Sequence, residues 1–388
     1  MTSDECQNFD IQYSLFNIRY SIFCNMETVL RFKHEDLLDF VVRYMTKLGV
    51  PAGDAKIVGN VLICADIRGV ESHGLHRLGS YYGNRISKGW IDPLTPFKII
   101  SETPSTALID GGNGCGQVVS HKAMKMTIEK AKSAGIAAIT VRNSNHYGIA
   151  GYYAMMAMRK GMIGISLTNS QPLVAPTFGR TAVLGTNPIA MAAPSDKAYP
   201  FLLDMATSAV AYGKIQVYEK KHEHIPIGWG IDEQGMPTNE PSLIKPGGHG
   251  ALLPLGGMDI TAGYKGYGLA VLVEILCSAL SGGNFLTNVG GPGKPEPTGV
   301  SHFFMAINIE AFRPILDFKQ HMDDMITLLK KSPLAVGRDE IHVAGEKEFE
   351  YAEFNEIHGV PLIKPIVDDL IMEGAKIGVP FDCPHVNE

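Results

Sequence analysis

The sequence predicts an α/β fold in which helices pack on a sheet. Residues from about 28 to 89 have helical periodicity, with apolar stripes that end at glycines. After Pro93 and Pro96, short β-favouring runs alternate with helical segments, which is typical of a sheet covered by helices. The 388 residues suffice for two domains, or for one domain with an insertion.

The predicted elements follow in order along the chain. Gly49 ends a first helix and Pro51 opens a second, and a third is expected from Ser72 to Gly89. Strands are predicted at 106–110, 136–141, 163–168, 182–184, 190–193, 200–204 and 302–309. Further helices are predicted at 118–134, from about 148 to 160, at 266–280 and at 315–330.

Composition excludes several classes of protein. Apolar residues make up 45% and charged residues 19%, which fits a soluble globular chain. The net charge of −6 and the absence of a Lys/Arg-rich run argue against nucleic acid or an anionic membrane as partner. No window reaches the roughly 18 apolar residues of a membrane span.

Cysteines and the N-terminus indicate the compartment. The six cysteines are scattered without CxxC pairs, so free thiols in a reducing compartment are expected. Residues 1–26 are acidic where a secretory signal needs positive charge, and too acidic and Arg-poor for a mitochondrial presequence. They are interpreted as an extension of unassigned purpose, and a cytoplasmic location is expected.

His146 is the first candidate catalytic residue. It follows a strand and the turn Asn143-Ser144-Asn145, and a helical pattern begins near Gly148. Open α/β sheets place ligands at such junctions, and a helix's positive end would keep the imidazole neutral and able to accept a proton. The alternative is a histidine that caps a helix in an ordinary turn.

Ser72, His73 and Arg77 form a second candidate group at the start of the expected third helix. Helical spacing would bring His73 and Arg77 onto one face, with Ser72 as cap. A guanidinium fork suits bidentate binding of a carboxylate. The alternative is that Arg77 pairs with a surface acid and His73 only packs.

The loop 111–116 (GGNGCG) resembles a dinucleotide loop only superficially. GxGxxG is not met, because Gln117 and Val119 stand where the last glycine is needed, and the acidic residue about twenty positions on is missing. The glycines still permit close approach of backbone to a ligand or a helix.

Lys265, at a helix start, is a candidate phosphate or carboxylate site, and Asp204 could accept hydrogen bonds from a ribose or simply cap a helix. No metal site is predicted, since His222 and His224 lack a third ligand.

Six segments in order give the chain a family resemblance. It resembles the type-2 malate/L-lactate dehydrogenases over roughly residues 27 to 375. The segments are SHGLHRL (72–78), NSNHYGIAGYYA (143–154), TNSQPLVAP (168–176), GTNPIAMAAP (185–194), DMATS (204–208) and YKGYGLAVLVEIL (264–276).

The resemblance implies a fold that is not Rossmann. A helical domain built from both chain ends carries an inserted, largely antiparallel α/β domain that binds the cofactor, and the protein is a homodimer with sites near the interface. The expected divisions are 1–26 (extension), 27–105 (first helical part), 106–260 (inserted domain), 261–376 (return to the first domain) and 377–388 (tail).

The resemblance also implies hydride transfer between NAD, with NADP possible, and a 2-hydroxy acid such as malate. His146 matches the proton acceptor, Arg77 the carboxylate-binding residue, and Ser72 and His73 the substrate-side motif. A cyclic ketimine carboxylate reductase and a silent binding protein are the alternatives. One departure is Gly179-Arg180, where the family has paired glycines. Cofactor-contacting positions match Ser170, Asp204, Met205, Ala206 and Lys265, and more loosely His321, Met322 and Asp323.

Overall fold

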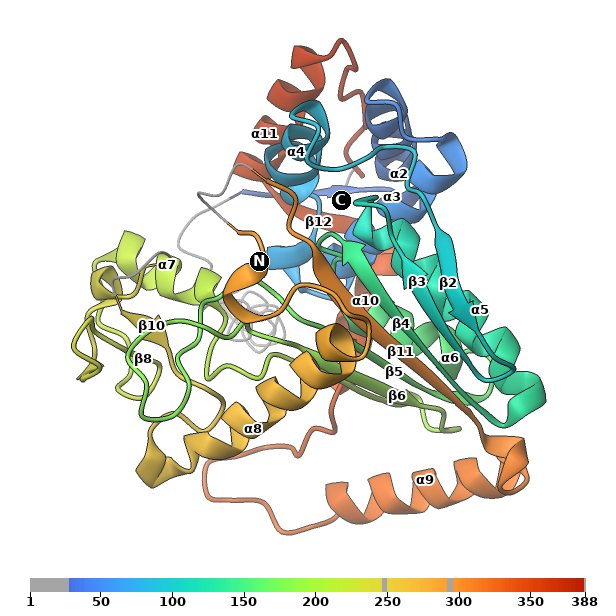
Figure 1. Cartoon of the computed structure of the whole chain (residues 1–388), viewed down its shortest axis with the longest axis vertical. Helices are drawn as coiled ribbons and strands as arrows, with labels where there is room; N and C mark the ends of the chain where they lie inside the picture. Colours follow the sequence, from blue (N-terminus) through green and yellow to red (C-terminus); the bar gives the residue numbers. More distant parts are fainter. Residues whose placement is uncertain (1–27, 246–249, 292–295, 387–388) are drawn as a thin grey trace, which may run out of the picture.

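A seven-stranded sheet forms the centre of the structure, a computed structural model that describes residues 28–245, 250–291 and 296–386 (Figure 1). The strand order is β2-β3-β4-β11-β5-β6-β7. The strands are β2 (Lys98–Glu102), β3 (Thr106–Asp110), β4 (Ile136–Ser144), β11 (Val300–Asn308), β5 (Met162–Thr168), β6 (Ile189–Ala193) and β7 (Phe201–Met205).

Neighbouring strands of this sheet run antiparallel, apart from the parallel pair β3 and β4. The sheet is therefore not a Rossmann sheet, as predicted. Because β11 is antiparallel to both β4 and β5, and β6 to both β5 and β7, strands β3, β4, β5 and β7 point the same way. Their C-terminal ends lie along one edge, which we call the carboxyl edge.

Helices cover both faces of the sheet. On one face lie α5 (Gly116–Ala134) and α6 (Gly151–Met158), and on the other lie α8 (Gly263–Glu274) and its π-helical continuation Ile275–Ala279 (Figure 1). Adjacent residues of β11 show the alternation, since Phe304 packs in the α5/α6 core and Phe303 against Val273. Both faces are thus buried around the centre of the sheet.

The two chain ends share a separate hydrophobic core. Strand β1 (Val29–Phe32) pairs antiparallel with β12 (Val360–Ile363), and buried side chains such as Phe40, Leu62 and Leu370 pack together around this pair. The helices involved are α2 (His34–Lys47), α3 (Ala52–Ile67), α10 (Glu346–His358) and α11 (Lys364–Lys376). The return to this core comes later than residue 261, because β11 lies in the middle of the sheet.

The remaining elements surround the sheet. A small sheet of order β10-β8-β9 packs beside α7 (Tyr212–Lys221), and α9 (Ile315–Lys330) lies along the end of the molecule (Figure 1). Within the described part of the chain, no helix has the length and apolar character to cross a membrane. The small strands are β8 (Gly230–Ile231), β9 (Pro237–Thr238) and β10 (Ala251–Leu252), and short 3-10 turns lie at Pro241–Leu243, Asp259–Thr261, Leu286–Asn288 and Ile309–Ala311.

Three sequence predictions need correction. The third helix is broken into a 3-10 turn (Glu71–His73), a π-helix (Leu78–Gly83) and α4 (Asn84–Ser87), because buried Asp66 accepts a hydrogen bond from Leu75 N (2.8 Å) and interrupts the helical pattern. The predicted strand 182–184 is only a bridge between Leu184 and Val174. The helix after His146 begins at Gly151, not near residue 148.

Candidate active site

The loop that carries His146 is fixed by the glycine-rich loop. Asn145 is fully buried, and its Nδ2 donates hydrogen bonds to the carbonyl oxygens of Asn113 (3.1 Å) and Gly114 (2.9 Å). At Gly116 any Cβ would overlap the carbonyl oxygens of Asn145 and His146, so only glycine permits this approach of α5. The predicted close approach is therefore to the histidine loop.

His146 lies at the carboxyl edge, just after the end of β4, and is half-buried. Its Nδ1 is 2.6 Å from the hydroxyl oxygen of Tyr82, and its ring stacks on His73 with 5.3 Å between centroids. Tyr81 meets the ring edge-on at 5.6 Å. Among the described residues no hydrogen bond involves Nε2 of His146, so this nitrogen can meet a substrate.

The surroundings keep both stacked imidazoles neutral. Burial, and next the positive charge of Arg77, hold the pKa of His146 well below its ordinary value. The same two causes, in the same order, lower the pKa of His73 to about 3. The predicted cause, the positive end of a helix, is wrong, because α6 begins five residues after His146.

Ser72, His73 and Arg77 come from the turn before the π-helix. Ser72 does not cap a helix; its Oγ is 2.9 Å from His73 Nδ1, and its carbonyl oxygen accepts from Arg77 Nε at 2.6 Å. A shared helical face was thus the wrong reason for the proximity of His73 and Arg77, although Arg77 does lower the pKa of His73. The terminal nitrogens of Arg77 make no hydrogen bond within the described residues and can bind a carboxylate.

Tyr81 and Tyr82 are site residues that the sequence did not indicate. Tyr82 is buried, and its hydroxyl finds its partner in His146, while the Tyr81 ring faces the Arg77 guanidinium at 5.9 Å. Burial raises the pKa of Tyr82, so this hydroxyl stays protonated. A pair of tyrosines in a helical pattern is normally core, and the sequence contains no signal that separates the two roles.

Four of the proposed cofactor positions lie along the same carboxyl edge. Ser170 follows the end of β5, and its Oγ accepts from Thr186 N at 3.0 Å. Met205 ends β7, between Asp204 and Ala206. The structure therefore brings these positions to the edge where His146 lies.

Backbone contacts place the start of α8, which carries Lys265, near these positions. Leu255 N donates to the carbonyl oxygen of Thr207 at 2.8 Å, and Gly266 packs so closely on Leu255 that a Cβ there would overlap it. The start of α8 thus lies next to the segment that follows Ala206. The Lys265 side chain is exposed.

Asp204 combines exposed surface with a raised pKa. Its Oδ2 accepts a hydrogen bond from Gly151 N (2.7 Å) in the first turn of α6. The surrounding protein raises the pKa of Asp204 to about 6 by desolvation, which the hydrogen bond from Gly151 and the charge of Arg68 oppose. Asp204 therefore supports α6, as the helix-capping alternative proposed.

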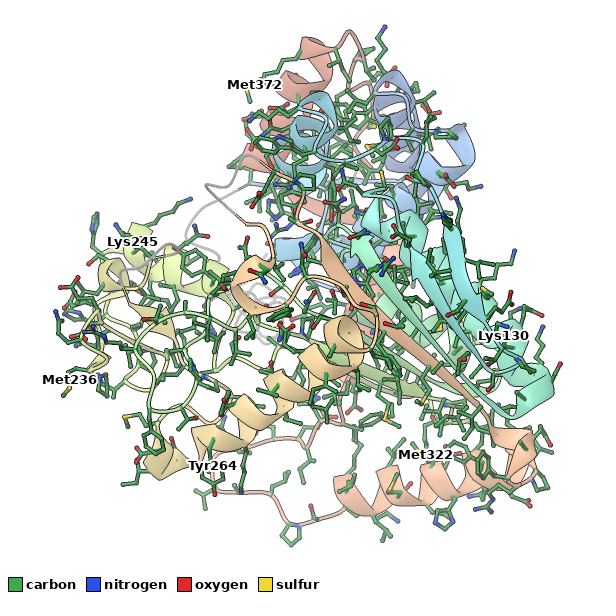
Figure 2. The ribbon with its side chains drawn as sticks, in the orientation of Figure 1. Lys130, Met236, Lys245, Tyr264, Met322 and Met372 are labelled. Carbon is green, nitrogen blue, oxygen red and sulfur yellow. The ribbon has the colours of Figure 1, made fainter. Side chains whose placement is uncertain are left out.

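The segment 321–323 lies elsewhere in this chain. Asp323 Oδ1 accepts from the backbone nitrogens of Asp196 (3.1 Å) and Lys197 (3.2 Å), in the turn between β6 and β7 at the opposite edge of the sheet. Figure 2 shows Met322 on α9, at the opposite end of the molecule from Met372 on α11. Arg180 is exposed, and its Cβ lies beside Gly235.

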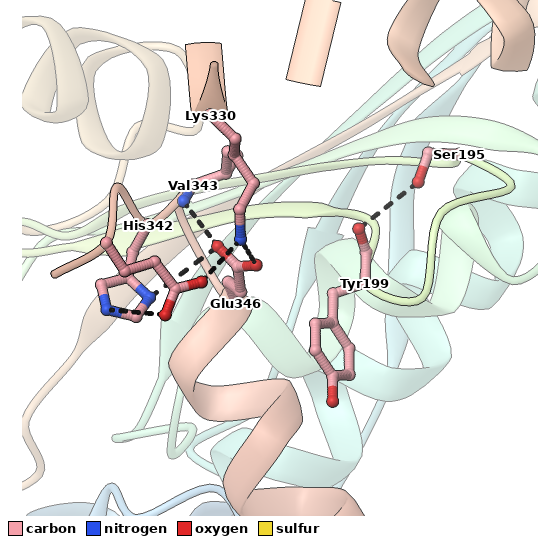
Figure 3. Close-up of polar contacts among 7 residues, drawn as sticks. Ser195, Tyr199, Lys330, His342, Val343 and Glu346 are labelled. Carbon is pink, nitrogen blue, oxygen red and sulfur yellow. Dashed lines mark hydrogen bonds and ion pairs between the residues drawn. The ribbon is translucent and has the colours of Figure 1, made fainter. Parts of the chain in front are cut away.

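A second polar cluster fastens α9 to α10. Lys330 forms ion pairs with Glu340 (2.9 Å) and Glu346, and Glu346 Oε2 accepts from Val343 N at 3.0 Å (Figure 3). Glu340, His342 and Glu350 are close enough together to hold a metal ion. Lys330 offsets part of the negative charge of this cluster, and its two ion pairs join α9 to the segment that opens α10.

The candidate active site therefore combines a neutral imidazole with one unfilled nitrogen and a guanidinium beside it. Such a pair can move a proton on a small substrate that carries a carboxylate. These features define the class as an enzyme for acid–base chemistry on a small carboxylic acid.

Comparison with known proteins identifies the family. A family model described as "Malate/L-lactate dehydrogenase" matches residues 32–371. The malate dehydrogenase of Pyrococcus abyssi is 50% identical over 91% of this chain and 96% of its own length, and the L-sulfolactate dehydrogenase of Methanocaldococcus jannaschii is 42% identical over 81% and 88%. The solved structure of malate dehydrogenase from Pyrococcus horikoshii OT3 superposes with a TM-score of 0.83 at 44% identity, covering 92% of this chain and 98% of that one.

The chain belongs to the malate/L-lactate dehydrogenase family. It is an oxidoreductase of the 2-hydroxyacid dehydrogenase type, a family that uses a nicotinamide cofactor. The resemblance noted in the sequence is confirmed.

Proposed function

We propose that this enzyme interconverts malate and oxaloacetate, with NAD(H) as cofactor. The observation that supports this proposal is the unfilled Nε2 of His146 beside the guanidinium of Arg77. The names of the similar proteins, malate dehydrogenase among them, point to the same substrate class.

In this proposal, Arg77 binds the carboxylate of the substrate and His146 acts on its C2 hydroxyl. Arg77 binds the substrate carboxylate through its terminal nitrogens, while its Nε stays on the Ser72 carbonyl oxygen. Nε2 of His146 takes the proton of the C2 hydroxyl as a carbonyl forms. A bound nicotinamide would supply the acceptor for the hydride of C2. Because Nε2 must be unprotonated to accept that proton, Nδ1 carries the hydrogen and donates it to the Tyr82 hydroxyl oxygen both before and after the transfer.

Substrate binding changes the pKa of His146. The positive charge of Arg77 is the second cause of the low pKa of His146. A carboxylate bound to Arg77 offsets that charge and raises the pKa of the imidazole. The ring thus becomes a better proton acceptor when a substrate is present, which favours productive complexes.

The residues along the carboxyl edge fit a nicotinamide cofactor. Ser170, Met205 and Ala206 are partly exposed there, and the exposed ammonium of Lys265 beside the start of α8 suits a phosphate. Asp204, Ser170 and Lys265 would contact the cofactor by this proposal. NAD is the first choice and NADP the alternative.

The test is oxidation of NADH and of NADPH by the purified protein, with oxaloacetate, other 2-oxo acids and a cyclic imino acid as substrates. We expect turnover with oxaloacetate and faster oxidation of NADH. Turnover with the cyclic imino acid alone would replace the proposal by a ketimine carboxylate reductase. Absence of nicotinamide binding in calorimetry would favour a silent binding protein.

We also propose that the protein is a homodimer. Helix α9 presents Leu316 and Leu328, each 71% exposed, together with half-exposed Leu329, and a second copy of the chain would cover them. A dimer would also allow His321, Met322 and Asp323 to approach the partner's carboxyl edge. Light scattering should give twice the chain mass of 42.1 kDa, and the mass of a single chain would reject the dimer.

A further inference from the structure

Glu274 is a buried carboxylate behind the carboxyl edge. It ends α8 and is 6% exposed. Two side-chain amides donate to it, Asn169 Nδ2 (3.2 Å) and Asn187 Nδ2 (3.1 Å). Ser278 Oγ lies 2.9 Å from the carboxylate and 2.6 Å from the Glu274 carbonyl oxygen, and it shares one hydrogen between the two. No salt bridge joins it to any residue that the structure describes. A buried carboxylate held by neutral donors depends on the amides that face it, because a lost amide bond leaves the charge poorly solvated.

The carboxylate determines which way two asparagine amides face. Since it can only accept, Asn169 and Asn187 must each turn an NH2 group toward it. Their carbonyl oxygens then face backbone donors. Asn169 Oδ1 accepts from Ser301 N at 2.8 Å, and Asn187 Oδ1 accepts from Ser170 N at 3.1 Å.

Asn187 links Glu274 to two of the proposed cofactor positions. Its side chain accepts a hydrogen bond from Ser170 N, and its backbone has a positive φ of 33°. Its backbone carbonyl oxygen accepts a hydrogen bond from Thr207 Oγ1 at 3.0 Å. Thr207 directly follows Ala206. The segments after β5, before β6 and after β7 are therefore connected through one carboxylate.

We propose that Glu274 is a positioning residue for the cofactor site. It acts through Asn169 and Asn187 and does not contact the cofactor itself. The inference rests on the proposed function, because it takes Ser170 and Ala206 as cofactor-binding positions.

Glu274→Gln tests the proposal with almost no change in shape. The amide has one oxygen, so its NH2 must face the NH2 of one asparagine, which turns or withdraws. We expect the Kd for NADH to rise about tenfold, which corresponds to one hydrogen bond of about 1.4 kcal/mol, while kcat at saturating cofactor changes by less than about threefold.

A reciprocal exchange separates positioning from general destabilisation. Asn187→Asp alone sets carboxylate against carboxylate, and its Kd should rise more than that of Glu274→Gln. In the double variant the amide introduced at position 274 can donate to the carboxylate introduced at position 187, so NADH should bind more tightly than to Asn187→Asp alone. Recovery should stay incomplete, because Asn187 Nδ2 also donates to the carbonyl oxygen of Ala270 (3.1 Å), a bond that an aspartate cannot make. Ser278→Ala is the matched control, because it removes a donor to Glu274 without touching either loop, and its Kd should be unchanged.

The outcomes separate this proposal from the proposed function. Wild-type protein that binds neither NADH nor NADPH would overturn the proposed function. Wild-type binding with an unchanged Kd in Glu274→Gln, or a rise equal to that of Ser278→Ala, would overturn the positioning role. If the single variants do not fold, failure of a folded double variant to bind NADH overturns it.

Discussion

Two histidines near the carboxyl edge, His146 and His302, have similar electrostatics and different surroundings. His302 lies on β11 with no exposed surface, and its Nδ1 and Nε2 are each 2.8 Å from a hydroxyl oxygen, those of Thr168 and Ser144. It stacks on Tyr147, the residue after His146, with 4.6 Å between centroids. Burial lowers the pKa of His302 to about 3.

The comparison separates a structural histidine from the proposed catalytic histidine. A lowered pKa does not distinguish them, because burial lowers it in both. His302 has a partner at each nitrogen, whereas His146 has Tyr82 at Nδ1 and an unfilled Nε2 beside Arg77. The difference lies in the unfilled nitrogen and the nearby cation.

The largest expected effect is on turnover in His146→Ala. Loss of the proton acceptor should lower kcat by about 10³-fold, the usual range for a general base. The Kd for NADH and the melting temperature should stay near the wild-type values. Steady-state kinetics with malate, calorimetry and thermal melting check these expectations, and a variant that keeps most of its activity would remove His146 from the mechanism.

Arg77→Gln should act on substrate affinity and on the pH profile. Loss of a charge-assisted carboxylate contact should raise KM for oxaloacetate about 100-fold. Because Arg77 lowers the pKa of His146, its removal should raise that pKa, so the acidic limb of malate oxidation moves to higher pH. The wild-type limb should lie below pH 6.5. A limb that does not move would contradict the coupling of Arg77 to His146.

His302→Phe should affect stability and not chemistry. It leaves the hydroxyls of Thr168 and Ser144 without their partner, at a cost of about 2–4 kcal/mol in the free energy of unfolding. His302→Gln, which can keep one bond, should cost less. Chemical denaturation measures both, and a large loss of kcat at low temperature in the folded variant would mean that His302 takes part in the reaction.

The same histidine gives a pH dependence of defined sign. Its folded-state pKa of about 3 lies below the unfolded value near 6.5, so its stabilisation is complete above about pH 6.5. That stabilisation is lost as the pH falls from there toward 3. The fall in unfolding free energy over this range should be smaller in His302→Phe than in wild type, and equal slopes would rule His302 out as the cause.

Tyr82→Phe should give the smallest effect. Removal of one neutral hydrogen bond to Nδ1 should lower kcat about fivefold to tenfold, with KM for oxaloacetate nearly unchanged. Tyr81→Phe is the matched control, since its ring and not its hydroxyl contacts His146. Equal losses in the two variants would mean that packing, and not the hydrogen bond, orients His146.

The sequence by itself determined the local elements and the family, and it indicated the candidate catalytic residues. Short β-favouring runs placed β4, β5 and β11, the apolar stripe of α2 ended at Gly49 as its spacing required, and the ordered motifs identified the family. These features depend on periodicity and residue chemistry within short windows, and both can be taken directly from the amino-acid sequence.

Only the tertiary structure decided which distant residues meet. Tyr82 and His146 are 64 positions apart, and Asn169 and Glu274 are 105 apart. Sheet order, with β11 inserted between β4 and β5, and the packing of α8 beneath that sheet bring such pairs together. In a single sequence, a buried tyrosine is interpreted as a core residue and a buried glutamate as part of a helix surface. The reason is that the hydrogen-bond partner of the polar group lies outside any local pattern.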